Sequence, residues 1–408
     1  MGGFSVIQWT RRVTVSKRDV VVLSAVRSAI GSFGGSLADM EPPELAGIVM
    51  KEAVARSGVD PLAVNYVTVG NTIPTDSRFA YVARVAAINA GLPMDSVAMS
   101  VNRLCSSGLQ AVVTSAHSVL LGDCDFGIGG GVEVMSRGGY LSTAMRSGAR
   151  MGDTKLVDTM VATLTDPFGV GHMGITAENL AAKWSITREQ QDMLAVESHR
   201  RAARAIAEGR FKSQIIPIVK RTKKGETIFD TDEHVKPNTS LDILAAMKPA
   251  FKKDGSVTAG NASGINDGAA FLVIADSAAA AAAGHKPIAR LVSYAVAGVP
   301  NDVMGEGPIP ATRLALKKSG LELHQMDVIE SNEAFAAQAI AVARALELDM
   351  EKTNPNGGAI ALGHPIGCSG AFLATKAIHE LHRTGGRYAL VTMCVGGGQG
   401  IAAIFERV

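Results

Sequence analysis

Two cysteines and one histidine stand beside glycine-rich turns, in positions typical of catalytic side chains. Cys105 follows an apolar run that ends at Val101 and precedes a helix-forming segment that begins at Gly108. A thiol between a strand and a helix lies at the positive end of that helix, where exposed N–H groups favour the thiolate and lower its pKa. Ser107 and Gln110 have the spacing of a capping box, which indicates a helix start here. We therefore expect Cys105 to be a nucleophile, although an isolated cysteine is more often a small buried hydrophobic residue.

The other two groups lie near the end of the chain. His364 is in the glycine-rich segment 354–370, on a loop that precedes a helix. Glycines let backbone and ligand approach closely, and an imidazole titrates near neutral pH, so His364 is a candidate general base. Cys394 ends a strand and enters the loop 395–400, whose N–H groups have the pattern of an oxyanion-binding nest. The alternative for Cys394 is a structural residue at a strand end before a bulge.

A scaffold of alternating strands and helices must position these groups. β-Branched runs separated by Ala-rich segments predict parallel βαβ units and an α/β fold. Cys-Ser-Ser-Gly at 105–108 and Cys-Ser-Gly at 368–370 each open a helix that leads to a strand and a triple glycine, which predicts a similar half at each end of the chain. The expected strands are 19–24, 64–70, 95–101, 126–130, 288–295, 328–331 and 388–393, and the expected helices are 42–57, 78–90, 108–121, 332–348 and 370–382.

The middle of the chain differs from both ends. Residues 135–265 have weaker strand signals and more charge, and a capping box at Thr187 and Gln190 predicts a helix that reaches about Glu208. Residues 199–224 hold nine Lys or Arg and one acid. This basic segment is either a solvated face or a site for a polyanionic small molecule that carries phosphates. Nucleic acid is the third choice, because neither interleaved aromatic residues nor a binding motif accompanies the charge.

Composition excludes several classes of protein. The chain has 408 residues, of which 47% are hydrophobic and 19% charged, so we expect a folded protein of more than one domain. The net charge of +2 gives no global signal for nucleic acid. We expect no membrane helix, because no apolar run reaches about 18 residues, and no metal, because no cluster has ligand spacing. Residues 1–17 hold Arg11, Arg12 and Lys17 without an acid, and are either a targeting segment or an unstructured start.

Six ordered motifs, which extend from about residue 102 nearly to the end of the chain, resemble the thiolase family, and most closely its bacterial-type biosynthetic acetoacetyl-CoA thiolases and β-ketothiolases. The resemblance runs from about Arg18 to Val408. It implies the thiolase fold, in which two similar βαβ halves form a five-layered αβαβα core with an inserted loop domain. The motifs are NRLCSSG (102–108), HMGITAEN (172–179), TAGNASGINDG (258–268), NEAF (332–335), GHPIG (363–367) and CVGGG (394–398).

The resemblance also implies a division of the chain. The N-terminal half would comprise 18–134 together with 266–286, and the C-terminal half would comprise 287–408. Residues 135–265 would form the loop domain that binds coenzyme A, so the basic segment would meet the nucleotide phosphates. Residues 1–17 would lie outside the fold.

Catalytic roles follow by motif position. Cys105 is expected to accept the acyl group, His364 to take its proton, and Cys394 to act as the second acid and base. Asn332, which taken alone has the place of a helix N-cap, is expected to hold a water that completes an oxyanion site with His364. The N–H groups of Cys105 and Gly396 are expected to form the other oxyanion hole.

Coenzyme A contacts are implied in the same way. Ser263 is expected to meet the pantetheine amide, and His172 and Met173 to lie beside the thioester. Lys236 stands near the adenine position, where relatives often have an arginine. A lysine stacks less well on a planar ring than an arginine does, and it cannot form bidentate hydrogen bonds. The apolar walls of the tunnel are expected to be Phe251, Met304, Ala334 and Phe335.

The activity that the resemblance implies is that of an acetyl-CoA C-acetyltransferase, which condenses two acetyl-CoA to acetoacetyl-CoA and CoA, or thiolyses short-chain 3-ketoacyl-CoA, through an acyl-cysteine. The alternative is a broad-specificity 3-ketoacyl-CoA thiolase of β-oxidation. A decarboxylating β-ketoacyl synthase is less favoured because Cys394 occupies the third catalytic position, and a non-catalytic acyl-CoA carrier because all three groups are intact. No cofactor beyond the CoA thioesters is implied. A homotetramer is implied, and we expect a cytoplasmic location, or a mitochondrial one if residues 1–17 are a targeting segment.

Overall fold

The computed structural model describes residues 18–222 and 225–408, so the expectations for residues 1–17 lie outside the described residues. Its core is a mixed sheet in two parts, ordered β13-β14-β15-β12 in the C-terminal half and β1-β11-β5-β3-β4 in the N-terminal half. The parts join where β1 and β12 pair over two registers, Val21 with Arg290 and Val22 with Ala289. The bounds are β1 Val20–Ser28, β3 Tyr66–Gly70, β4 Val97–Val101, β5 Phe126–Val134, β11 Asn266–Asp276, β12 Ala289–Gly298, β13 Val328–Ser331, β14 Tyr388–Val395 and β15 Gln399–Arg407.

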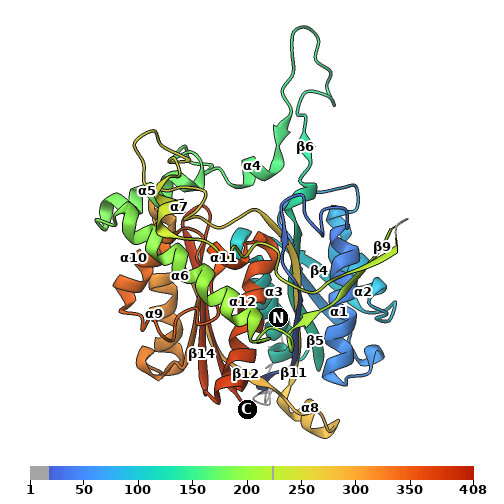
Figure 1. Ribbon diagram of the computed structural model, residues 1–408. Coiled ribbons are helices and arrows are strands. Elements are labelled where there is room, and N and C mark those ends of the chain that lie inside the picture. The colour runs from blue at the N-terminus through green and yellow to red at the C-terminus, as the bar shows by residue number, and fades with distance from the viewer. Residues whose placement is uncertain (1–17, 223–224) are drawn as a thin grey trace, which may run out of the picture.

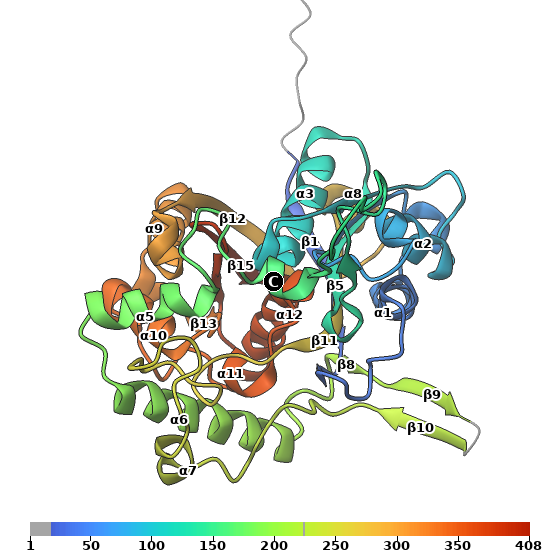
Figure 2. The same cartoon turned by 90° about the horizontal axis from the view of Figure 1, so that it is seen from above.

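Helices cover both parts of the sheet and fill the space between them (Figures 1 and 2). Helices α3 (Ser107–Leu121) and α12 (Ile366–Thr384) form the central layer, because α12 packs on β5 and β11 as well as on β13 and β14. Helix α3 packs on β3 and β5 and reaches β12 through a 2.7 Å hydrogen bond between His117 Nε2 and the Tyr294 hydroxyl. The outer layers are α1 (Pro42–Ser57) and α2 (Val82–Asn89) on one side, and α9 (Pro308–Ser319) and α10 (Ala336–Leu346) on the other. The expected α/β fold of five layers is confirmed.

The two central helices cross at glycines. A Cβ on Gly108 would lie 2.9 Å from the backbone nitrogen of Ala371, and one on Gly131 would lie 2.0 Å from the carbonyl oxygen of Gly367. Only a residue without a side chain permits this approach of α3, α12 and β5. The crossing brings the starts of α3 and α12 together, and these starts carry Cys105 and His364.

Several elements differ from the sequence-based expectation, among them β15 and α9, which were not expected. Strand β11 pairs with both β1 and β5 and is fully buried, but it was not among the expected strands. Helix α12 begins at Ile366 rather than at residue 370, and α10 begins at Ala336 rather than at residue 332. The capping box of Thr187 and Gln190 is confirmed at the start of α6 (Arg188–Ala207).

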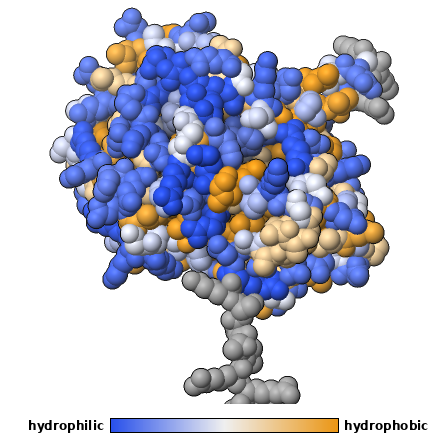
Figure 3. Space-filling view, turned by 90° about the horizontal axis from the view of Figure 1, so that it is seen from below, coloured by the Kyte–Doolittle hydropathy of each residue, from blue (hydrophilic) through white to orange (hydrophobic). Residues whose placement is uncertain are grey.

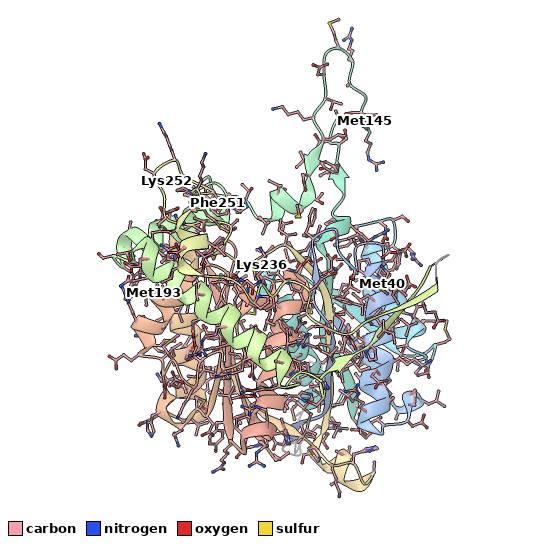
Figure 4. The ribbon with its side chains drawn as sticks, in the orientation of Figure 1. Met40, Met145, Met193, Lys236, Phe251 and Lys252 are labelled. Carbon is pink, nitrogen blue, oxygen red and sulfur yellow. The ribbon has the colours of Figure 1, made fainter. Side chains whose placement is uncertain are left out.

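The middle of the chain lies across one end of this core. An arm that includes β6 (Tyr140–Leu141), β7 (Val157–Asp158) and Met145 stands away from the body (Figures 1 and 4). The hairpin of β9 and β10 projects on the side opposite α5 and α7 in both ribbon views. The remaining elements are β2 Gly31–Ser32, α4 Thr159–Thr163, α5 Met173–Lys183, β8 Ile215–Ile216, β9 Ile218–Thr222, β10 Gly225–Phe229, α7 Leu241–Ala245, α8 Ser277–Ala282 and α11 Ala359–Leu362.

One described helical stretch, Leu104–Leu121, is long and apolar enough to cross a membrane. It is largely the central helix α3, whose apolar residues pack against the sheet, and 61% of it is buried. Its hydropathy is therefore that of a core helix. The face of the molecule in Figure 3 is mostly hydrophilic, with apolar residues in small groups.

Candidate active site

The catalytic candidates converge at the carboxyl ends of the strands. Cys105 lies in a short 3-10 turn between β4 and α3, His364 in the loop between α11 and α12, and Gly396 in the turn between β14 and β15. Together they line one cavity of about 50 Å³. Its other lining residues are Leu104, Thr163, Leu164, Met173, Ser263, Met304, Ala334, Phe335 and Ile366.

The turn that carries Cys105 is strained. Leu104 has a φ of 46°, a left-handed conformation that a branched residue rarely adopts. The Ser107 hydroxyl holds this turn, because it accepts a 2.9 Å hydrogen bond from the Arg103 N–H and donates a 2.7 Å bond to the Leu104 carbonyl. The expected capping box of Ser107 and Gln110 is therefore absent, since Ser107 closes the turn before the helix and Ser106 occupies the N-cap position.

The expected low pKa of Cys105 is wrong for the free protein. Burial raises the pKa of Cys105 to about 11, and the N–H groups of Gly396 and Cys105 only partly oppose this rise. Desolvation of the sulfur outweighs the stabilisation from the helix start. The thiol is thus protonated at neutral pH and needs a base. Both N–H groups are close enough to the sulfur to stabilise its thiolate form.

His364 is held in one tautomer. The Ser369 hydroxyl donates a 2.9 Å hydrogen bond to the Pro365 carbonyl and lies 2.6 Å from Nδ1 of His364. Because the Ser369 hydroxyl already donates its single proton to Pro365, its oxygen must accept a hydrogen bond from Nδ1–H of His364. The other ring nitrogen of His364, Nε2, therefore has the lone pair. The Asn332 amide lies 3.4 Å from Nε2 and donates to it. Burial lowers the pKa of His364 to about 4, so the ring is neutral at pH 7 and free to accept a proton.

Two further side chains fix the His364 loop. Asn266 of β11 accepts a 3.0 Å hydrogen bond from the His364 N–H, and Gly363 has a φ of 103° where a Cβ would lie 2.5 Å from Asn266. The buried Glu133 carboxylate accepts 2.8 Å and 3.1 Å bonds from the N–H groups of Gly367 and Thr72.

No role of Ser369, Asn266 or Glu133 was expected from the sequence. For Glu133 a signal existed, because a lone acid stands within the apolar run 126–134. Asn266 lies inside the motif 258–268, and Ser369 inside the segment 354–370, but neither residue's type or position indicates a function by itself.

Asn332 is not a helix N-cap. It follows β13 and its N–H donates a 3.0 Å bond to the Thr392 carbonyl, while Phe335 is the N-cap of α10. The NEAF segment is therefore extended, and its Ala334 carbonyl accepts a 3.0 Å bond from the Ser263 N–H. This pairing brings Ser263 to the cavity.

Cys394 lies behind the cavity rather than at its surface. Its side chain has no exposed area and packs with Met173, Met304 and Phe335. Burial raises the pKa of Cys394, and the nearby Cys105 raises it further, so the two sulfurs are close enough to interact. The methionines that cover Cys394 are unbranched and adaptable.

Aromatic rings form the outer wall. His172 stacks on Phe251 with centroids 4.7 Å apart, and Phe251 meets Phe335 edge to face at 6.1 Å. The Gly174 N–H donates a 3.1 Å bond to Nδ1 of His172, and a Cβ on Gly174 would lie 2.2 Å from the Phe251 ring. The local sequence His-Met-Gly therefore sets the position of this wall.

Lys236 lies outside the cavity. Its side chain is exposed, and its N–H donates a 3.1 Å bond to Nδ1 of His199. In Figure 4 it lies in the centre of the molecule, with Phe251 and Lys252 above it. Among the candidates from sequence, Lys236 is the one that the structure leaves apart from the others.

Several basic residues of the segment form ion pairs with nearby acids. Arg200 and Arg201 pair with Glu197 at 2.6 Å and 2.5 Å. Arg210 and Lys220 also form ion pairs, with Glu208 and Asp39. These pairs support a solvated face rather than a phosphate site. Residues 223 and 224 of the segment lie outside the described residues.

Within residues 18–222 and 225–408, no group of three or more His, Cys, Asp or Glu could hold a metal ion.

The chain is similar to known proteins over most of its length. The family models "Thiolase, N-terminal domain" and "Thiolase, C-terminal domain" match residues 20–278 and 285–407. The β-ketothiolase BktB of Cupriavidus necator is 57% identical over 96% of this chain and 100% of its own length. The acetyl-CoA acetyltransferase of Pseudomonas aeruginosa is 48% identical, over 96% and 100%.

Solved structures agree with this relationship. The crystal structure of the Bacillus anthracis acetyl-CoA acetyltransferase has a TM-score of 0.95 and 45% identity, and covers 97% of this chain and 100% of its own. Human mitochondrial 3-ketoacyl-CoA thiolase in complex with CoA has a TM-score of 0.93 and 42% identity, over 96% and 98%.

Proposed function

Because the chain belongs to the thiolase family, we propose that it is an acetyl-CoA C-acetyltransferase. It would condense two acetyl-CoA reversibly to acetoacetyl-CoA and CoA, or thiolyse short-chain 3-ketoacyl-CoA. The observation that carries this proposal is the shared cavity of Cys105, His364 and Gly396. The test is direct: purified protein supplied with acetyl-CoA alone should form acetoacetyl-CoA, whereas a decarboxylating synthase would need malonyl units.

In the first half-reaction His364 Nε2 takes the proton of the Cys105 thiol, and the thiolate attacks the thioester carbonyl of acetyl-CoA. The C–S bond to CoA breaks, and the CoA sulfur leaves with the proton that His364 held. The raised pKa of Cys105 and the lowered pKa of His364 support a neutral pair that ionises only during attack.

Charge on the reacting oxygens needs preorganised donors. The N–H groups of Cys105 and Gly396 would stabilise the oxyanion formed on the Cys105 adduct. A second site, made by His364 and a water held by Asn332, would receive the thioester oxygen of the other acetyl-CoA. For this role the proton would move to Nε2 of His364, and the Ser369 hydroxyl would turn to donate to Nδ1. The 3.4 Å contact between Asn332 and His364 supports this pairing.

Cys394 would act in the second half-reaction. It would remove the α-proton of the second acetyl-CoA, and the resulting enolate would attack the acetyl group on Cys105. In thiolysis it would return a proton to the leaving enolate. Because Cys394 is covered in the free protein, Met173 and Met304 would have to shift when acyl-CoA enters.

The loop domain, residues 135–265, would hold coenzyme A. The pantetheine would pass between Ser263 and the wall of His172, Phe251 and Phe335, with Met173, Met304 and Ala334 around the acyl end. The exposed Lys236 and Lys252 would meet the nucleotide. No cofactor beyond the CoA thioesters would be needed, and a cytoplasmic location is part of the same proposal. A mitochondrial location would need a targeting role for residues 1–17.

A homotetramer, arranged as a dimer of dimers, belongs to the same proposal. The arm of β6 and β7 carries Tyr140, Met145 and Met151 with 66%, 68% and 94% of their surface exposed. Apolar side chains on an arm that stands away from the body are typical of contacts between subunits. Light scattering of the full chain should give four subunits.

A broad-specificity 3-ketoacyl-CoA thiolase is the second candidate, and the human mitochondrial relative supports it. The cavity beside Cys105, about 50 Å³, favours short acyl groups instead. Steady-state thiolysis across a series of 3-ketoacyl-CoA chain lengths separates the two, because kcat/KM should fall beyond the shortest substrates.

A further inference from the structure

A second cavity lies outside the active site. It has a volume of about 470 Å³ and opens between α6, α10 and the loop that follows β13. This volume is within the usual range of small-molecule sites, roughly 300 to 1,000 Å³. Its walls are apolar, formed by Leu194, Ala339, Ile340, Ala343 and Leu348.

The floor of this cavity is a polar strand end. Ser331 is 3% exposed, and its hydroxyl has no hydrogen-bond partner among the described residues. Asn354, which has a φ of 46°, binds the backbone of Ser331 with its side-chain amide. It accepts a 3.0 Å hydrogen bond from the Ser331 N–H and donates a 2.8 Å bond to the Ser331 carbonyl. A buried hydroxyl without a partner costs free energy, which a ligand atom would recover.

The rim carries one positive charge that is not paired. Arg344 is exposed and donates to the Trp184 carbonyl and the Gln190 amide oxygen, and it forms no ion pair with any described residue. The lining holds two acids, and both already have partners: Glu197 pairs with Arg200 and Arg201, and the buried Glu333 accepts hydrogen bonds from Ser198 and Asn354. An anion is therefore the charge that the rim attracts.

We propose that this cavity binds a medium-chain carboxylic acid that carries a second polar group. Its carboxylate would meet Arg344, its chain would lie among the apolar walls, and its far polar group would reach Ser331. Because Ser331 immediately precedes Asn332, occupancy would act on the backbone that holds an active-site amide. The site is separate from the cavity beside Cys105, so the proposal does not depend on the proposed function.

Calorimetric titration tests this site with octanoate and its terminally hydroxylated derivative. The protein is first alkylated at Cys105 with iodoacetamide, which closes the active site. One saturable site should remain, with the hydroxylated acid binding more tightly than octanoate. Loss of binding on alkylation, or no saturation at millimolar acid, would overturn the proposal.

Variants locate the site. Ala339→Trp fills the cavity and should abolish saturable binding, and Arg344→Gln should weaken it about two- to fivefold, the usual worth of an exposed ion pair. Arg313→Gln is the matched control, since Arg313 is an exposed arginine outside the cavity that bonds the Ala345 carbonyl. Equal affinity in Ala339→Trp and the unmodified chain, or an equal loss in Arg313→Gln and Arg344→Gln, would refute it.

Discussion

Replacement of Ser369 by alanine tests how His364 is prepared to act as a base. In the structure the Ser369 oxygen accepts from Nδ1–H of His364 at 2.6 Å, so the lone pair is on Nε2, where it accepts a long 3.4 Å bond from the Asn332 amide and can take the Cys105 proton instead. When His364 takes that proton, the ring becomes an imidazolium and the same bond becomes charge-assisted. Ser369→Ala removes the acceptor and lets the ring adopt the other tautomer.

The magnitude follows from the bond that is lost. A hydrogen bond to a charged group contributes about 1.5–3 kcal/mol, which corresponds to about a 10- to 150-fold slower acylation. Binding of acetyl-CoA should change little, because Ser369 is 1% exposed and does not line the cavity. Ser369→Thr keeps the oxygen and should recover part of the rate.

Rapid-quench mass spectrometry of the Cys105 peptide after mixing with acetyl-CoA measures this rate. Thr375→Ala is the matched control, because Thr375 lies on the same helix and donates a similar 2.9 Å bond to the Ala371 carbonyl, away from the site. If Ser369→Ala acetylates as fast as Thr375→Ala, the tautomer argument fails.

Three further outcomes are expected. Alkylation of Cys105 by iodoacetamide should be nearly independent of pH between about 5 and 10, because the neutral pair spans that range. In His364→Ala the alkylation rate should rise about tenfold per pH unit with the thiolate fraction, up to the Cys105 pKa of about 11. A wild-type alkylation rate that depends on pH would contradict a neutral pair of Cys105 and His364. Gly363→Ala should lower the melting temperature more than Gly284→Ala, because both have positive φ but only the Gly363 Cβ would strike a neighbour; equal shifts would count against the packing argument. Phe251→Ala should raise KM about two- to tenfold with kcat nearly unchanged, since it removes one stacked wall; a fall in kcat alone would place Phe251 elsewhere in the mechanism.

Much of the site could be predicted because its residues sit in short glycine-rich motifs at the ends of strands. Cys105, His364 and Gly396 are far apart in the chain, yet each follows or precedes a central element of the fold. The crossing of α3 and α12 at glycines then brings them together. The α/β class followed from the alternation of strands and helices.

What could not be predicted depends on tertiary burial. The pKa of Cys105 was expected to fall, but desolvation is a property of the packed site and not of the local helix start. The charge of the basic segment could not be judged from the segment alone, because two of its acidic partners lie outside it. Glu197 lies just before the segment, and Asp39 is 181 residues from Lys220. Asn332 had the place of an N-cap, but its own bond to Thr392 and the bond from Ser263 to Ala334 hold its segment outside the helix.

The division of labour between the two sulfurs is the central claim, and acyl transfer in two variants measures it. After mixing with acetyl-CoA, Cys394→Ala should carry an acetyl group on Cys105 at close to the wild-type rate yet form no acetoacetyl-CoA, while Cys105→Ala should carry none. Equal loss of acetylation and condensation in Cys394→Ala would contradict the account.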